Sequence, residues 1–141
     1  MTSSEQIIVS CVDKAVVAIM SPMDGRFITL ISLYESGIYK PWQAVELPSG
    51  LLAVSSFGQC HRVWLIDHNG TVKQWYGSRG SGSGELEHPR GLLRWRTSQN
   101  SVLVCDRDNN RIVSVDFSSS QSDVLASDIH GPFAAAVDVA T

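Results

Sequence analysis

The fold is decided by residues 104–116, which read VCDRDNNRIVSVD. Two runs rich in Val and Ile flank the polar segment DRDNN, and an arginine follows that segment directly. Val and Ile favour β-strands, whereas Asp and Asn favour turns because their side chains hydrogen-bond to the nearby backbone. The stretch therefore predicts two strands joined by a tight polar loop, with a calcium-binding loop as the alternative.

The spacing of these polar residues argues against calcium. Asp106, Asp108 and Asn110 do alternate along the chain, as the ligands of an EF-hand loop do. The sixth position of such a loop requires glycine and the twelfth requires glutamate, but this sequence has Arg111 and Phe117 there. No helical pattern flanks the segment, so we expect a hairpin loop without calcium.

The rest of the chain carries the same strand pattern. Short runs rich in Val, Ile and Leu end at Gly, Asn, Asp, Ser or Pro, and no window shows the apolar stripe of an amphipathic helix. Asp24-Gly25 and Asn69-Gly70 stand between such runs, and both dipeptides are typical of hairpin turns. With 43% apolar and 18% charged residues, the composition is that of a globular protein.

The order of these runs repeats along the chain. Residues 89–116 contain a proline, two apolar runs, the polar loop, an arginine and a third apolar run, and residues 41–67 repeat this order. The matching arginines are roughly 50 residues apart. A weaker copy occupies residues 7–19, and a further copy starts at residues 131–138. A repeat of this length with four short strands is typical of a β-propeller blade.

We therefore predict an all-β fold, a β-propeller segment of four-stranded antiparallel blades. One blade cannot bury both of its faces alone, so each is expected to stack against its neighbours. The strands are labelled a to d from the innermost outward. The predicted strands a to d are 42–46, 51–55, 62–67 and 71–75 in one blade, and 91–95, 101–105, 111–117 and 122–126 in the next.

The strand count predicts an incomplete ring. The expected units are a partial first blade (strands b to d) at 1–40, a second blade at 41–78, a glycine-rich connector and third blade at 79–130, and the first strand of a further blade at 131–141. Propellers typically have about 4–8 blades, so these units alone cannot close. Either the sequence is a piece of a longer propeller, or copies join as a homo-oligomer to complete the ring.

Residues 76–117 resemble an NHL-repeat propeller, similar to the C-terminal propeller of tripartite-motif proteins. The resemblance rests on the connector YGSRGSGSGELEHPRGL at 76–92 and on VCD and NRI at the two ends of 104–112. Residues 41–75 follow the pattern less closely, and residues 6–31 share only the strand order. The resemblance implies that the polar segment is the loop between strands b and c.

The same resemblance implies a structural lock in that loop. Asp106 is expected to accept hydrogen bonds from loop N–H groups, and Arg111 to pair with Asp106 or with an adjacent carbonyl. The Asp position holds Ser56 in the second copy and Cys11 in the first. Only one copy therefore carries the complete lock.

A candidate binding surface follows from the expected topology. The loops between strands d and a and between strands b and c emerge on one face of a propeller, and polar loops on rigid scaffolds commonly bind partners. We define this loop face by its candidate partner-binding residues: His61, Arg62, His88, Arg90, Arg107, Asn109 and Asn110. Acidic residues accompany the basic ones, so an internally paired, solvated surface is the alternative. The four tryptophans lie within predicted strands, and inter-blade packing is their expected role.

By resemblance, the predicted function is a non-catalytic module for protein–protein interaction, including substrate recruitment by a ubiquitin-ligase-like scaffold. RNA binding through the loop face is the alternative, and a propeller lyase or hydrolase is a third hypothesis. The sequence has no G-x-S-x-G, and its four histidines form no H-E-x-x-H. We therefore predict no catalytic residue, no metal and no cofactor. RING and B-box spacings are also missing, so the chain itself is not expected to ligate ubiquitin.

The sequence also predicts where the chain resides. Its net charge is −3, so no overall positive field attracts nucleic acid. The longest apolar run, residues 15–20, is far shorter than the ~20 residues of a membrane span. The N-terminus lacks the features of a secretion signal. Three cysteines without a C-x-x-C fit a reducing compartment, and we predict a cytoplasmic protein without membrane contact.

Overall fold

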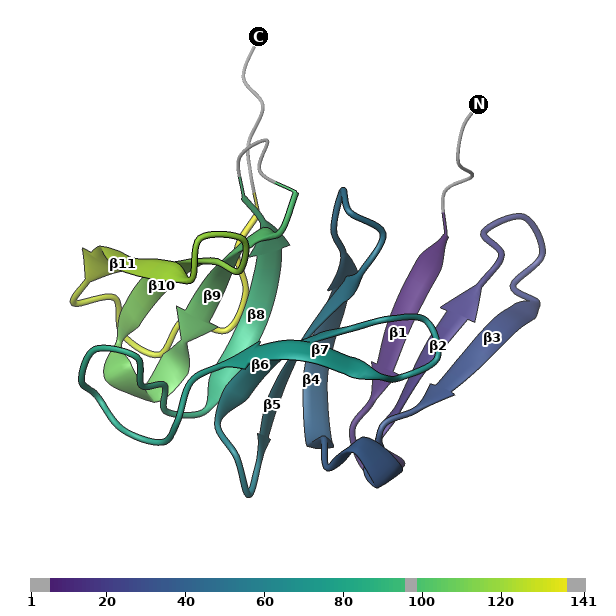
Figure 1. Ribbon diagram of the computed structural model, residues 1–141, viewed down its shortest axis with the longest axis horizontal. Helices are drawn as coiled ribbons and strands as arrows, with labels where there is room; N and C mark the ends of the chain where they lie inside the picture. Colours follow the sequence, from purple (N-terminus) through teal and green to yellow (C-terminus); the bar gives the residue numbers. More distant parts are fainter. Residues whose placement is uncertain (1–5, 96–98, 137–141) are drawn as a thin grey trace, which may run out of the picture.

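The computed structural model describes residues 6–95 and 99–136, and these form three antiparallel sheets that stand side by side (Figure 1). The first sheet contains β1 (Ile7–Cys11), β2 (Val16–Met20) and β3 (Phe27–Ser32). The second contains β4 (Tyr39–Glu46), β5 (Leu52–Gly58), β6 (Arg62–Ile66) and β7 (Val72–Tyr76). The third contains β8 (Pro89–Arg94), β9 (Ser101–Asp106), β10 (Arg111–Asp116) and β11 (Gln121–Ser127). Two short 3₁₀ turns, η1 (Tyr34–Ser36) and η2 (Arg107–Asn109), complete the described elements.

The strands of each sheet follow one another in chain order and pair as antiparallel neighbours. The β6–β7 turn shows the local cause: the Asp67 carboxylate accepts the N–H groups of Asn69 at 2.8 Å and Thr71 at 3.0 Å, and Gly70 takes a φ of +83°. The prediction of an all-β, incomplete propeller of antiparallel blades is confirmed.

Contacts between the sheets repeat in the way that propeller blades require. β8 contacts both β4 and β5, and β4 contacts β1. The contact of β1 with β4 corresponds to the contact of β5 with β8. Because β5 is the second strand (strand b) of its blade, β1 has the same position in the first blade. β4 and β8 are the innermost strands (strand a) of the second and third sheets.

The middle sheet packs against both of its neighbours, because its side chains point alternately to its two faces. On β6, Trp64 and Ile66 lie in a buried cluster shared with the first sheet, whereas Val63 and Leu65 lie in a cluster shared with the third. Because successive strand residues face opposite sides, one sheet contributes to two cores. Away from these two clusters, Leu30 on β3 is 62% exposed.

The connector between β7 and β8, residues 77–88, is held by its own contacts. Leu86 is fully buried in the core between the second and third sheets. Its N–H donates to Ser78 O at 2.8 Å, and its carbonyl accepts the Gly80 N–H at 3.0 Å. Gly77 has a φ of +111°, and a Cβ there would lie 2.8 Å from the His61 carbonyl oxygen. Although its glycines and serines are typical of a flexible connector, the segment is a packed part of the fold.

The predicted first strand of a further blade, residues 131–141, is described only as far as residue 136. Residues 131–136 pair with no strand among the described residues, and residues 137–141 lie outside the described part of the chain. The backbone of this segment runs against β8, where a Cβ on Gly91 would lie 2.5 Å from Phe133 O. A strand needs a hydrogen-bonded neighbour, and the described residues supply none for this segment.

No helix in the described part of the chain combines the length and the apolar character needed to cross a membrane.

Candidate functional site

The loop face is built from the β5–β6 turn, the end of the connector and η2. Backbone contacts join these segments: Asp108 N–H donates to Glu87 O at 3.0 Å, and His88 N–H donates to His61 Nδ1 at 2.8 Å. The residues predicted for this face do not form one group. They divide into a basic and aromatic cluster, a structural lock, and a separate arginine on a tryptophan.

The structural lock is centred on Asp106, whose side chain is fully buried at the end of β9. Its Oδ2 accepts hydrogen bonds from Arg111 Nε at 2.7 Å and from Asn109 Nδ2 at 2.8 Å. Its Oδ1 accepts the Glu87 N–H at 2.7 Å. The carboxylate therefore ties the η2 loop, the start of β10 and the connector together. Asn109, expected on a partner-binding surface, is engaged in this lock.

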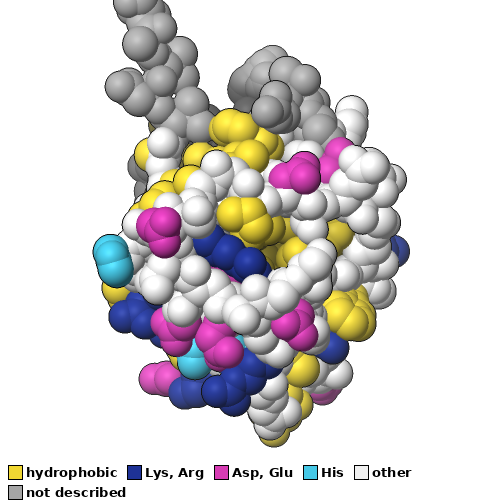
Figure 2. Space-filling view, turned by 90° about the vertical axis from the view of Figure 1, so that its left-hand side faces the viewer, with side chains coloured by type: hydrophobic (Ala, Val, Ile, Leu, Met, Phe, Trp, Pro, Cys, Tyr) yellow, Lys and Arg dark blue, Asp and Glu magenta, His cyan; other side chains and the backbone are white. Residues whose placement is uncertain are grey.

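The Arg111 side chain also donates hydrogen bonds to backbone carbonyl oxygens of the connector. Its Nη2 donates to the carbonyl of Glu85 at 2.8 Å, and its Nη1 donates to the carbonyl of Ser81 at 3.1 Å. These bonds line one side of a hollow of about 310 Å³ beside Tyr76 and Val124. Figure 2 shows the hollow on this side of the molecule, with basic and apolar side chains inside it. The donors of Arg111 are thus used to order the loop.

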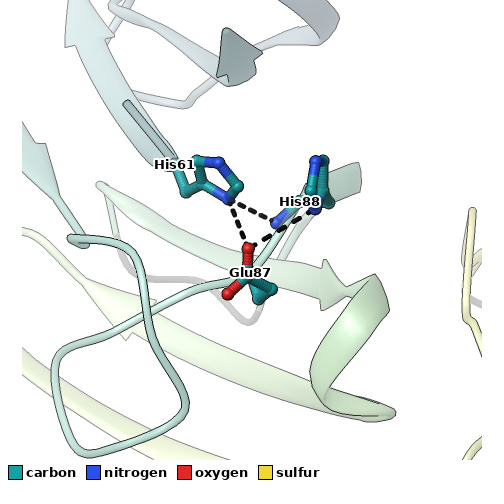
Figure 3. A group of neighbouring side chains, drawn as sticks. All are labelled: His61, Glu87 and His88. Atoms are coloured by element: carbon teal, nitrogen blue, oxygen red, sulfur yellow. Dashed lines mark hydrogen bonds and ion pairs between the residues drawn. The ribbon is translucent and has the colours of Figure 1, made fainter. Parts of the chain in front are cut away.

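Three titratable side chains meet beside the lock (Figure 3). Glu87 Oε2 lies 3.3 Å from His61 Nδ1 and 3.5 Å from His88 Nδ1. His88 Nδ1 also lies 2.8 Å from Asp108 Oδ2, an ion-pair distance that lacks hydrogen-bond geometry. The two imidazole rings pack edge to face at 4.5 Å. Glu87 and Asp108 were not predicted for this surface, although both are next to predicted residues in the sequence.

His61, Glu87 and His88 are the described residues that could hold a metal ion, because one ligand atom from each lies within 4.8 Å of the others. His61 Nδ1 and Glu87 Oε2 already accept hydrogen bonds from other parts of the chain. His61 Nδ1 accepts the His88 N–H at 2.8 Å, and Glu87 Oε2 accepts Arg79 Nε–H at 3.0 Å. A metal at His61 Nδ1 would have to displace the His88 N–H, because that nitrogen has a single lone pair, so we propose no metal centre here.

His61 is kept neutral by its surroundings. Burial lowers its pKa below the ordinary value of 6.5, and the neighbouring His88 lowers the pKa further, against the raising effect of Glu87. The neutral ring can accept the His88 N–H through Nδ1. The imidazole therefore has a structural role in joining the β5–β6 turn to the connector.

A pH-dependent stability follows from this neutral histidine. The unfolded chain takes up a proton at His61 as the pH falls below 6.5, whereas the folded chain takes it up only at lower pH. Stability from this group is thus complete above pH 6.5 and declines below it, until folded His61 is protonated. The free energy of unfolding, measured in urea, should fall between pH 7 and pH 5. We expect this fall to be smaller in His61→Gln than in the wild type. The matched control is His68→Gln, on the half-exposed His68, and an unchanged slope in His61→Gln would contradict the assignment.

Arg90 and Arg107 form the basic part of the cluster, and aromatic rings surround them. The guanidinium carbon of Arg90 lies 4.0 Å from the Phe57 ring centre, 4.5 Å from that of Trp42 and 6.0 Å from that of Phe133. The guanidinium carbon of Arg107 lies 4.5 Å from the Phe133 ring centre. These rings come from β4, β5 and the segment after β11, and the sequence patterns did not predict them for this surface.

The remaining predicted residues lie apart from this cluster. The guanidinium of Arg62 lies 3.5 Å from the ring centre of Trp75 and donates to Gly77 O at 3.2 Å. Trp75, expected between blades, is instead half exposed at the surface. The Arg62 guanidinium covers one face of its ring. Asn110 has a φ of +53° and accepts the Gly131 N–H at 2.9 Å. Its side chain therefore anchors the segment that carries Phe133.

The chain matches no protein-family model, and no curated protein matches it. Its propeller-like architecture is therefore supported by the topology of its sheets. The loop face presents a charged and aromatic surface that is joined by hydrogen bonds to the Asp106 lock.

Proposed function

We propose that this chain is a non-catalytic interaction module that binds a protein partner through the loop face. The observation that carries the proposal is the convergence of His88, Arg90 and Arg107 with three aromatic rings on a surface that the Asp106 lock makes rigid. Arginine and aromatic side chains are enriched at the energetic centres of protein interfaces. Rigid positioning lowers the entropy that such a surface loses on binding.

The wider role is proposed from the NHL resemblance. In that role the module is similar to the propellers of cytoplasmic tripartite-motif proteins, and it recruits substrates for a ubiquitin-ligase-like scaffold whose catalytic segment lies elsewhere. The motifs at residues 76–92 and 104–112 support this reading. RNA binding through the same face is the second candidate. The unpaired guanidinium donors of Arg90 and Arg107 favour it, whereas the neighbouring carboxylates Glu87 and Asp108 oppose it.

Site-specific crosslinking tests the protein-binding proposal. A photoreactive amino acid replaces Gln59 in the β5–β6 turn of the loop face, or Asn69 in the β6–β7 turn at the opposite end of the sheet. Both positions are exposed amides in hairpin turns, so they form a matched pair. In an extract of the source cells, we expect the Gln59 probe to capture a protein that the Asn69 probe does not.

The outcomes separate the candidates. Equal capture from both turns would contradict the loop face as the binding surface. A product from the Gln59 probe that ribonuclease removes would favour RNA over a protein partner.

A further inference from the structure

Arg90 is a desolvated cation without an anion. Among the described residues, no carboxylate pairs with it, and its Nε and Nη1 atoms are buried without a hydrogen-bond partner. The Nε of Arg107 is also buried and unpaired, although its Nη1 reaches Asp108 at 2.7 Å. The three unpaired donors belong to two guanidinium groups that both lie near the Phe133 ring. Burying a charged donor without a hydrogen-bond acceptor destabilises the folded state, so most buried donors in proteins have an acceptor.

The aromatic rings do not replace that acceptor. A ring face attracts the guanidinium charge, but the five N–H groups of arginine lie in its plane and point to acceptors beyond its edges. Burial lowers the pKa of Arg90, the nearby positive charge of Arg107 lowers it further, and the negative charge of Asp108 opposes both effects. Two like charges are thus held close together in an apolar surrounding, an arrangement that an added negative charge would stabilise.

The neighbouring acids limit the anion that fits. Glu87 is engaged by Arg79 and lies against His61, and Asp108 is engaged by Arg107 and His88. They stand beside the unpaired donors and would repel a chain of phosphates passing over this surface. One compact anion at the unpaired donors of the two arginines meets less of this repulsion than a chain of phosphates does. A planar carboxylate also matches the parallel N–H groups of a guanidinium edge.

We propose that Arg90 and Arg107 form a carboxylate-binding site, which takes an acidic side chain or the C-terminal carboxylate of a partner protein. Phe57, Trp42 and Phe133 form its apolar walls and accommodate the residue that carries the carboxylate. This inference rests on the proposed protein-binding function and names the chemistry that the partner presents. The site is a charge-assisted anchor within the loop face, and neither arginine acts in catalysis.

The test follows the Nε–H signals of Arg90 and Arg107 by ¹⁵N NMR during titration of the whole chain. The probes are an N-acetylated, C-amidated Gly-Glu-Gly-Glu-Gly peptide, its Gln counterpart, an N-acetylated Gly-Gly-Gly peptide with a free carboxyl end, inorganic phosphate, and a short oligouridylate. We expect a saturable shift of both signals with the Glu peptide or the free carboxyl end. The Gln peptide should leave the signals in place.

Substitutions supply the matched comparison. Arg90→Gln removes the charge, Arg90→Lys keeps the charge but loses the planar pair of donors, and Arg94→Gln removes an exposed arginine from the same strand. We expect Arg90→Gln to weaken carboxylate binding by about tenfold or more, because a hydrogen bond to a charged group contributes on that order. Arg90→Lys should weaken it by less, and Arg94→Gln should bind as the wild type does.

Several results would overturn the inference. These are an absence of shifts with both carboxylate probes in the wild-type chain, an equal response to the Gln peptide, or tighter binding of phosphate or oligouridylate. The wild-type titration is decisive even if a variant fails to fold. The proposed function has a separate outcome: if the Gln59 probe captures its partner with the same yield at limiting partner concentration in the Arg90→Gln chain, the loop face binds protein and the carboxylate anchor is wrong.

Discussion

Replacing Arg111 by methionine is expected to destabilise the fold by about 3–5 kcal/mol, the cost typical of leaving one member of a buried ion pair without its partner. The Asp106 carboxylate is fully buried, and Arg111 Nε lies 2.7 Å from its Oδ2. Methionine has a similar length but no donor, so the charge would remain in a desolvated site with only Asn109 and the Glu87 N–H. The connector carbonyls at Ser81 and Glu85 would lose their donors as well.

Urea unfolding followed by tryptophan fluorescence measures this change. Arg26→Met is the matched control, because Arg26 is exposed in the β2–β3 turn and should change stability by less than about 0.5 kcal/mol. A double variant with Asp106→Asn and Arg111→Met should recover part of the loss, since no charge is then left buried. If Arg111→Met unfolds at the same urea concentration as Arg26→Met, the lock has no structural importance.

Truncation of Leu86 to alanine is expected to cost about 2–5 kcal/mol, the range for Leu→Ala in a close-packed core. Leu86 lies in a loop by secondary structure, yet it is fully buried beside Val63 and Val104. Its removal would leave a cavity at the junction of the second and third sheets. We expect the connector to open to proteases before the rest of the chain unfolds, because the bonds at Ser78 and Gly80 depend on its position.

Leu30→Ala is the control for this truncation. Leu30 is exposed on β3, so the same chemical change should have little effect on stability there. Thermal unfolding by circular dichroism and timed proteolysis give the two readouts. Equal melting temperatures for both leucine variants would show that the connector does not contribute to the core.

The strands could be predicted from the sequence because each depends on local patterns. Residues 101–106 form a short run rich in Val and Leu, Val113 and Val115 flank Ser114, and turn residues such as Asn69-Gly70 mark the ends of strands, so strand positions agree within a few residues. The pairing of Arg111 with Asp106 spans five positions and was expected from the resemblance. The strands and the Asp106–Arg111 pair could therefore be predicted, because each depends on residues that are close in the sequence.

The rest of the candidate site depends on contacts between distant parts of the chain. Phe133 meets Trp42, and Arg111 reaches Ser81, through a packing of sheets that no local spacing encodes. The glycines and serines of the connector are typical of a flexible segment, but Leu86 and the guanidinium of Arg111 order it. Trp75 was expected between blades, yet it is stacked on Arg62 at the surface because strand d lies at the outer edge.

The bonds from Arg111 to the connector also make that loop dispensable as a covalent link. Residues 81–84 are exposed, and the carbonyls of Ser81 and Gly82 are bound by a side chain that comes from β10. A backbone cut between Ser83 and Gly84 would leave one piece carrying the acceptors and the other carrying the donor, with the shared core between them. This is the place to divide the protein into two reassociating halves, or to open new termini in a circular permutant.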